Sequence, residues 1–210
     1  MGGLSGVRAA VFDVGETLVD ETNGWRGFAA HAGVPAERVF DELDRAVAER
    51  RHHRTALEAA AGRPLVPGEF SYVPTADDLY PDAVPVLRSL IDAGFAAGIV
   101  GNQPETIEPF LVGLDLELAL VGSSQRWGVE KPDPAFFERI CSELGLQPDE
   151  VAYVGDRLDN DILPAAAAGL RAVLVVRGPW GRQHAGWREA EQADVAVEGL
   201  VAIPRLLSQQ

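Results

Sequence analysis

The sequence predicts an α/β fold: a Rossmann-like parallel sheet with helices on both faces, plus a small inserted helical cap. Short apolar runs of strand length alternate with segments whose apolar residues recur every three or four positions. Because this alternation is typical of parallel sheets covered by helices, it indicates the fold class. The stretch between the first two apolar runs has only helical periodicity and is long enough to form a separate cap.

Six apolar runs are expected to be the strands of this sheet. They span residues 9–12, 95–100, 118–121, 151–154, 172–176 and 195–197. Helices are expected at 82–93, 105–111, 134–144 and 156–168. Residues 63–74, which carry Pro and Gly, and residues 177–186 are predicted to be loops. Residues 1–19 and 80–210 are therefore interpreted as the core domain, and residues 20–79 as the helical cap domain.

Composition and charge exclude several classes of protein. Of 210 residues, 47% are hydrophobic and 24% charged, as in ordinary globular proteins, and the formal net charge is −14. So acidic a chain argues against nucleic-acid binding, which needs a concentrated basic stripe. The single cysteine, Cys141, can form no internal disulfide, and no apolar run reaches the length of a membrane span. We therefore expect a cytoplasmic protein with a small-molecule partner and no membrane or nucleic-acid partner, and the sequence leaves open whether it is a monomer or homodimer.

Polar residues follow three of the predicted strands, where open α/β sheets place their ligands. They are Asp13, Asn102 and Asp156. A strand-end aspartate can also cap a turn, so a single one decides little. Two carboxylates at one sheet edge, however, repel each other unless a cation lies between them, and Mg²⁺ prefers oxygen ligands. Lys131, the only lysine among 18 lysine and arginine residues, stands in GVEKPDP, where it would balance this negative cluster or bind an anion beside it.

The motifs FDVGETL, GNQP, EKPDP and GDRLDND stand in the order and spacing of the haloacid dehalogenase (HAD) superfamily. This chain resembles that superfamily over nearly its whole length, from residue 7 to about residue 200. The resemblance implies a phosphatase-like, Mg²⁺-dependent hydrolase with an aspartate nucleophile and a helical cap inserted after the first strand.

By this resemblance, Asp13 is the nucleophile that forms an aspartyl-phosphate, and Lys131 holds the nucleophile and the phosphoryl oxygens. The implied metal residues are Asp13, Gly15 through its carbonyl, Asp156, and Asp161, which positions the waters of the metal. Stabilisation of charge by metal and lysine is the main requirement of phosphoryl transfer. Alternatively, Asp161 only caps the helix that follows it.

Two positions depart from the family pattern. HAD phosphatases carry a second aspartate, the general acid and base, where this chain has Gly15, and a Ser or Thr where it has Gly101. Loss of general acid catalysis typically costs ~10²–10⁴ in rate. Glu16 is a candidate replacement, although a solvated turn residue is the favoured interpretation of this position. Asn102, beside Gly101, completes the candidate catalytic residues.

We therefore expect a hydrolase of a small phosphorylated metabolite. The alternative is a catalytically weak or silent HAD-fold protein that binds a phosphorylated ligand or a partner, which Gly15 and Gly101 favour. A 2-haloacid dehalogenase is a further alternative, which the acids retained in GDRLDND disfavour. A phosphonate hydrolase is set aside because it needs a cap lysine, and residues 20–79 contain none.

Three further features have a structural and a functional interpretation. The run RRHHR at 50–54 is interpreted as a solvated helix end rather than a contact to an anionic substrate. Trp25 is interpreted as a core residue of the cap. The segment 177–186 follows a strand at the ligand-binding edge, so it is a candidate lining of the site.

Overall fold

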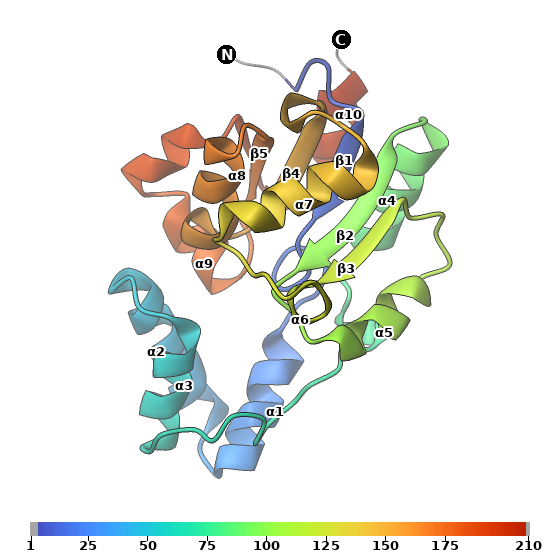
Figure 1. The fold of residues 1–210 in the computed structure, drawn as a ribbon. Helices are drawn as coiled ribbons and strands as arrows, with labels where there is room; N and C mark the ends of the chain where they lie inside the picture. The colour runs from blue at the N-terminus through green and yellow to red at the C-terminus, as the bar shows by residue number, and fades with distance from the viewer. Residues whose placement is uncertain (1–3, 209–210) are drawn as a thin grey trace.

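The computed structural model describes residues 4–208 and contains a six-stranded parallel sheet with the order β3-β2-β1-β4-β5-β6 (Figure 1). The strands are β1 (Ala9–Phe12), β2 (Ala96–Gly101), β3 (Leu120–Ser123), β4 (Val151–Gly155), β5 (Arg171–Val175) and β6 (Val195–Val197). The predicted α/β fold is confirmed, and every strand begins and ends within about two residues of its predicted position. Residues 1–3 and 209–210 of the predicted core domain lie outside the described residues.

β1 is a central strand whose side chains are buried on both faces of the sheet. Ala10 and Phe12 belong to the apolar core on one face, and Ala9 and Val11 to the core on the other. Successive side chains of a strand point to opposite faces, so a continuous apolar run fits where helices cover both faces. β1 pairs with β4 so that Phe12 lies opposite Val154, which brings the ends of both strands to the same edge.

Helices cover both faces of this sheet. The described helices of the core domain are α4 (Ala83–Asp92), α5 (Glu108–Val112), α6 (Ser124–Trp127), α7 (Pro134–Leu144), α8 (Leu163–Ala167), α9 (Gly178–His184) and α10 (Ile203–Ser208). Apolar residues of α4, α5 and α10 pack on one face, and those of α7 and α8 on the other. Figure 1 shows α7 in front of the sheet and α4 behind it.

Between β1 and α4 the chain forms a cap of helices with an apolar core of its own. These are α1 (Thr22–Ala32), α2 (Ala36–Ala48) and α3 (His53–Ala61), which lie beyond the carboxyl ends of the strands (Figure 1). The two connecting segments are bonded to each other, because the Tyr80 N–H donates to the Leu18 oxygen at 2.9 Å. These contacts support our proposed division into a core domain, 1–19 and 80–210, and a cap domain, 20–79.

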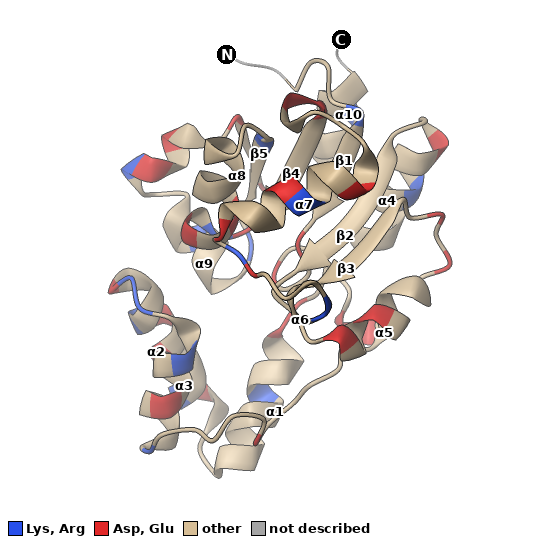
Figure 2. Ribbon diagram, viewed as in Figure 1, with Lys and Arg blue, Asp and Glu red and all other residues tan. Residues whose placement is uncertain are grey.

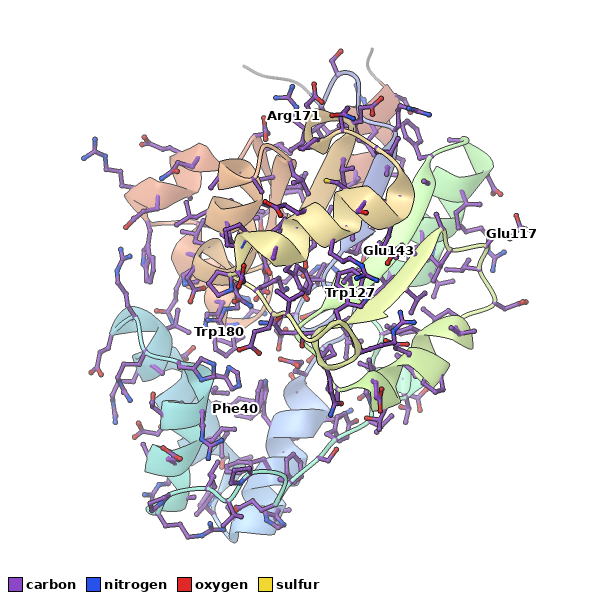
Figure 3. The ribbon with its side chains drawn as sticks, in the orientation of Figure 1. Phe40, Glu117, Trp127, Glu143, Arg171 and Trp180 are labelled. Carbon is purple, nitrogen blue, oxygen red and sulfur yellow. The ribbon has the colours of Figure 1, made fainter. Side chains whose placement is uncertain are left out.

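The segment 177–186 contains the helix α9, so the prediction of a loop there is wrong. Pro179 lies in the first turn of α9, where its missing N–H is tolerated. Trp180 is buried in the apolar core of the cap helices, and the Gln183 side chain donates to the Asp44 oxygen of α2 at 3.1 Å. Figure 3 shows Trp180 between α9 and the cap. Packing against the cap therefore overrides the low helix propensity of the glycines in α9.

Two predicted helices are divided at prolines. Residues 105–111 form a 3₁₀ turn (Glu105–Ile107) followed by α5, and residues 156–168 form a π-helical turn (Leu158–Ile162) followed by α8. Both α5 and α8 carry a proline in their first turn. Proline lacks the backbone N–H that the interior of a helix needs, so an uninterrupted α-helix cannot run through these positions without losing a hydrogen bond. The π-helical turn matters for the site because it carries Asp161.

Charged residues of both signs are distributed over the helices. Figure 2 shows acidic and basic residues together on the cap helices and on α7, so neither sign forms a continuous stripe on these elements. Within residues 4–208, the helices are too short or too polar to cross a membrane.

His184, at the end of α9, is buried and fixes the start of the π-helical turn. Its Nδ1 accepts the Leu158 N–H at 3.0 Å. Burial lowers the pKa of His184 from 6.5 to about 4. Between these two values the unfolded chain binds more protons than the folded protein, so the contribution of a neutral His184 to stability is lost as the pH falls.

We expect the free energy of unfolding to fall as the pH is lowered from neutrality to about 4, with His184 contributing on the order of 1–2 kcal/mol of the fall. His184→Asn keeps an acceptor for the Leu158 N–H but cannot be protonated, so its disadvantage against the unmutated protein should shrink at low pH. Urea unfolding of both proteins at several pH values measures this. A stability difference that stays constant over the pH range would contradict it.

Candidate active site

Three carboxylates meet at the carboxyl edge of β1 and β4. Asp13 directly follows β1, and its N–H donates to the Val154 oxygen at 2.8 Å, which continues the pairing with β4. Asp156 directly follows β4, and Asp161 returns to the same place on the π-helical turn. Oxygens of the three carboxylates lie within 4.8 Å of one another, and all three residues are buried. The carboxylates expected at this edge are thus brought together.

Lys131 supplies the ammonium of this cluster. Its Nζ donates to Asp13 Oδ1 at 2.7 Å and to Asp161 Oδ1 at 2.6 Å, and its side chain is 1% exposed. Burial alone would lower the pKa of Lys131, but attraction to Asp13 and Asp161 outweighs burial and raises this pKa well above its ordinary value. The ring of Tyr153 lies 5.3 Å from the Nζ. Lys131 is therefore a charged group held between two carboxylates.

Asp156 is the carboxylate that this lysine does not contact. Its Oδ2 is buried and has no hydrogen-bond partner among the described residues. Burial, with the nearby Asp161 and Asp13, raises the pKa of Asp156 well above its ordinary value. Three carboxylates around one ammonium carry an excess of negative charge, which a divalent cation with oxygen ligands would balance. The donor set and the orphaned oxygen therefore fit Mg²⁺.

Asn102 contacts the main chain of Lys131 through both ends of its amide. Its Nδ2 donates to the Lys131 oxygen and its Oδ1 accepts the Lys131 N–H, each at 2.8 Å. These two bonds fix the loop that carries the lysine. Asp161 contacts both the turn and the lysine, because its Oδ2 accepts the Arg157 N–H at 2.9 Å and its Oδ1 accepts the Lys131 ammonium. It makes no side-chain cap to α8, the helix that follows it.

Glu16 is buried, so its interpretation as a solvated turn residue is wrong. It is 4% exposed, and its Oε2 accepts the Tyr80 hydroxyl at 2.7 Å. Burial raises the pKa of Glu16, although the bond from Tyr80 acts in the opposite direction. Its carboxyl packs on Gly178, where an added Cβ would lie 2.6 Å from Glu16 Cδ. Glu16 is thus held by neighbouring protein groups.

Both glycines that depart from the family pattern have carboxyl groups beside them. A Cβ on Gly101 would overlap Asp13 Oδ1, so the missing side chain leaves room for that carboxylate. A Cβ on Gly15 would lie 2.7 Å from Oε1 of Glu21. Burial, together with Glu16 and Asp13, raises the pKa of Glu21 to about 8. Glu21 was not among the residues predicted from the sequence, where its only signal is the acidic pair that it forms with its neighbour.

These groups open into a cavity of about 530 Å³ between the core and the cap. Its lining includes Asp13 and Lys131 from the core, together with residues that the sequence did not assign to the site. Among these are Trp25, His52 and His53 of the cap. Trp25 therefore lines the cavity as well as packing against the cap core. Residues 177–186, which the sequence suggested as a candidate lining of the site, contribute Trp180 of α9 to this cavity.

The run 50–54 is exposed at Arg50, His52 and Arg54, which agrees with its interpretation as a solvated helix end, but its two histidines also line the cavity. Arg50 pairs with Glu189 at 2.8 Å, and Arg54 pairs with Glu58 at 3.2 Å. His52 and His53, in contrast, face the cavity. Burial lowers the pKa of His53 to about 3, so it lines the cavity as a neutral imidazole.

Comparison with known proteins identifies the family. The sequence profile of the haloacid dehalogenase-like hydrolases matches residues 7–169. The chain therefore belongs to this family of hydrolases, as its motifs predict.

Among curated relatives, the glyceraldehyde 3-phosphate phosphatase of Methanopyrus kandleri is 31% identical over 83% of this chain and 86% of its own length. The phosphoglycolate phosphatase of Photorhabdus laumondii subsp. laumondii is 32% identical over 83% and 82% of the two chains.

Solved structures share the fold. A HAD phosphatase from Thermococcus onnurineus superimposes with a TM-score of 0.63 at 22% identity, covering 97% of this chain and 99% of that one. The L-2-haloacid dehalogenase of Xanthobacter autotrophicus superimposes with a TM-score of 0.64 at 21% identity, covering 95% and 98%. Structures that carry out different reactions therefore resemble this one, and the fold alone does not select the reaction.

The charges of the cluster predict opposite effects of two substitutions in metal-free buffer. Lys131→Met should lower the free energy of unfolding by about 3–5 kcal/mol, because it leaves buried carboxylates unpaired. Asp156→Asn should raise it by about 0.5–2 kcal/mol, because it removes one of three mutually repelling charges. Chemical unfolding in the presence of a chelator measures both changes. Shifts of the same sign in the two variants would contradict this account of the cluster.

Proposed function

We propose that this protein is a Mg²⁺-dependent phosphatase that acts on a small phosphorylated metabolite through an aspartyl-phosphate formed on Asp13. The observation that carries the proposal is the position of the Asp13 carboxylate. It lies in the wall of the cavity, with one oxygen held by Lys131 and two further buried carboxylates beside it. A nucleophile fixed beside an ammonium and beside carboxylates that would hold a divalent cation is what phosphoryl transfer requires.

Asp13 is the proposed nucleophile. One of its carboxylate oxygens bonds to the phosphorus of the substrate, the bond from phosphorus to the leaving oxygen breaks, and that oxygen takes up a proton. Water then attacks the same phosphorus and releases a proton, the bond to Asp13 breaks, and phosphate leaves. Lys131 orients the carboxylate and holds positive charge beside the phosphoryl oxygens, where it stabilises the transition state.

Asp13, Asp156 and the Gly15 carbonyl are the proposed ligands of Mg²⁺, with Asp161 positioning its waters. The bound ion would supply positive charge to the phosphoryl oxygens. Asn102 is proposed to act as a positioning residue, since it contacts only the main chain of Lys131 among these groups.

The size of the cavity and the relatives support a small substrate. A volume of about 530 Å³ is in the range of sites for small metabolites. The curated relatives are named as phosphatases of glyceraldehyde 3-phosphate and of phosphoglycolate. The wall formed by His52, His53 and Trp25 would contact the part of the substrate away from phosphorus.

A catalytically weak or silent protein is the second candidate function, because Gly15 and Gly101 remove two side chains of the family pattern. A panel of phosphorylated metabolites, assayed with and without Mg²⁺, separates the two functions. Phosphate release that requires Mg²⁺ and is lost in Asp13→Asn supports the enzyme. Binding of phosphorylated compounds without any release of phosphate would favour the silent protein.

Mg²⁺ should raise the melting temperature of the unmutated protein, because an ion that binds only the folded state stabilises it. At a concentration about 100 times the dissociation constant, the gain is about 2.7 kcal/mol. Asp156→Asn should abolish the shift by removing a ligand, although this variant is expected to be the more stable one without metal. Thermal scans with Mg²⁺ and with a chelator measure the effect, and equal shifts in both proteins would exclude Asp156 as a ligand.

Lys131→Arg should lower kcat/KM by about 100-fold or more even though it conserves the charge. The planar guanidinium is larger than the ammonium that fits between Asp13 and Asp161, and it cannot reproduce the same contacts. Phosphate release by the folded variant measures the loss. Arg139→Lys, at an exposed position of α7, is the reciprocal control and should keep full activity. Full activity of Lys131→Arg would show that this position needs only a positive charge.

A further inference from the structure

The carboxyl group of Glu21 fills the space into which a side chain on Gly15 would extend. An added Cβ on Gly15 would lie 2.7 Å from Glu21 Oε1, 2.8 Å from Cδ and 3.1 Å from Oε2. The chain between them folds back, because Val19 bridges to Gly15 and the Glu16 N–H donates to the Val19 oxygen at 2.7 Å. A residue six positions along the chain thus places a carboxyl group beside the nucleophile segment.

The Glu21 carboxyl group belongs to the wall of the candidate active site. Both Gly15 and Glu21 line the cavity that contains Asp13 and Lys131. Glu21 occupies the N-cap position of α1, where a side-chain oxygen can accept a backbone N–H of the first turn. Its side chain makes no capping hydrogen bond, however, and no ion pair among the described residues includes it. Neither helix capping nor a salt bridge therefore accounts for its position.

Of the other acidic groups of the cavity wall, Glu130 is exposed to solvent and the rest are engaged elsewhere. Asp13 is the proposed nucleophile, and Asp156 is a proposed metal ligand. Glu16 accepts the Tyr80 hydroxyl at 2.7 Å and packs on Gly178. Asp159 pairs with Arg157 at 2.7 Å and is exposed. Glu21 is therefore the partly buried carboxyl group of this wall that no other side chain bonds among the described residues, so its oxygens remain available to a substrate.

We propose that Glu21 is a catalytic residue that exchanges a proton with the leaving-group oxygen, from the space that Gly15 leaves open. This inference rests on the proposed phosphatase function. As an oxygen of Asp13 bonds to phosphorus, the electron pair of the breaking bond goes to the leaving oxygen, which takes the proton of the Glu21 carboxyl. In the second half of the reaction Glu21 accepts a proton from the attacking water, phosphate leaves, and both carboxyl groups return to their initial forms.

Substrates with different leaving groups test this role. Glycerol phosphate must expel a weakly acidic alcohol and needs a proton, whereas para-nitrophenyl phosphate expels an acidic phenol that does not. We expect Glu21→Gln, which keeps the shape but holds no transferable proton, to lower kcat/KM for glycerol phosphate by about 10²–10⁴-fold. The loss for para-nitrophenyl phosphate should be under about tenfold. Glu37→Gln, an exposed glutamate of α2, is the matched control and should change neither rate.

Moving the carboxyl group to the neighbouring backbone position gives a second test. Gly15 has no left-handed φ, so an aspartate fits the backbone there, but its side chain would meet Glu21. Gly15→Asp alone should therefore be impaired. The double variant Gly15→Asp/Glu21→Ala should have a kcat/KM for glycerol phosphate at least about tenfold higher than that of Glu21→Ala. Circular dichroism and thermal unfolding of each variant establish that it is folded.

The outcomes distinguish failure of the proposed phosphatase function from failure of the proposed role of Glu21. No Asp13-dependent hydrolysis of either substrate by the unmutated protein would overturn the phosphatase function and the role of Glu21 together. Asp13-dependent hydrolysis with equal losses for both substrates in folded Glu21→Gln would overturn only the role of Glu21. The same is true if the selective loss for glycerol phosphate occurs in Glu16→Gln or His53→Ala instead. A selective loss in Glu21→Gln with rescue by the double variant supports the proposal.

Discussion

The contact of the Lys131 ammonium with Asp13 and Asp161 is the interaction on which the rest of the site depends. Three carboxylates buried at one sheet edge repel each other, and a buried charge without a partner costs several kcal/mol. One ammonium at 2.7 Å and 2.6 Å from two of them offsets much of this repulsion. The amide of Asn102 fixes the main chain of the lysine, so the position of the charge is set by β2 as well. The remaining carboxylate, Asp156, then has an oxygen left for a cation.

The absence of side chains at four glycines determines where the carboxyl groups of the site can lie. Gly155 leaves room for the Asp161 carboxyl, Gly101 for that of Asp13, Gly178 for that of Glu16 and Gly15 for that of Glu21. A carboxyl group needs to approach the backbone closely at each of these places, and a Cβ would prevent it. Compared with the family pattern, Gly15 and Gly101 each lack a functional side chain. In this structure the same two positions leave room for the carboxyl groups of Glu21 and Asp13.

The sequence by itself determined the fold class, the family and the central groups of the candidate site. Apolar runs of strand length indicate buried strands wherever helices follow them, because a strand covered on both faces needs no polar side chain. Asp13 and Asp156 stand directly after such runs, so parallel pairing of β1 and β4 must bring them together. Lys131 stood out as the only lysine of the chain. These inferences depend on local pattern and on the rule that parallel strands end at one edge, which sequence alone can supply.

Only the tertiary structure decided which further side chains reach this edge. The position of Glu21 beside Gly15 depends on how residues 15–20 fold back, and no periodicity encodes that bend. Glu16 is buried because Tyr80, 64 residues away in sequence, donates to it. Trp180 lies in a helix that local propensity opposes, because the cap supplies its apolar surroundings. In each case the deciding contact either joins segments that are distant in sequence or lies in a turn without a repeating pattern. Its contribution to the free energy of folding therefore cannot be predicted from local sequence patterns.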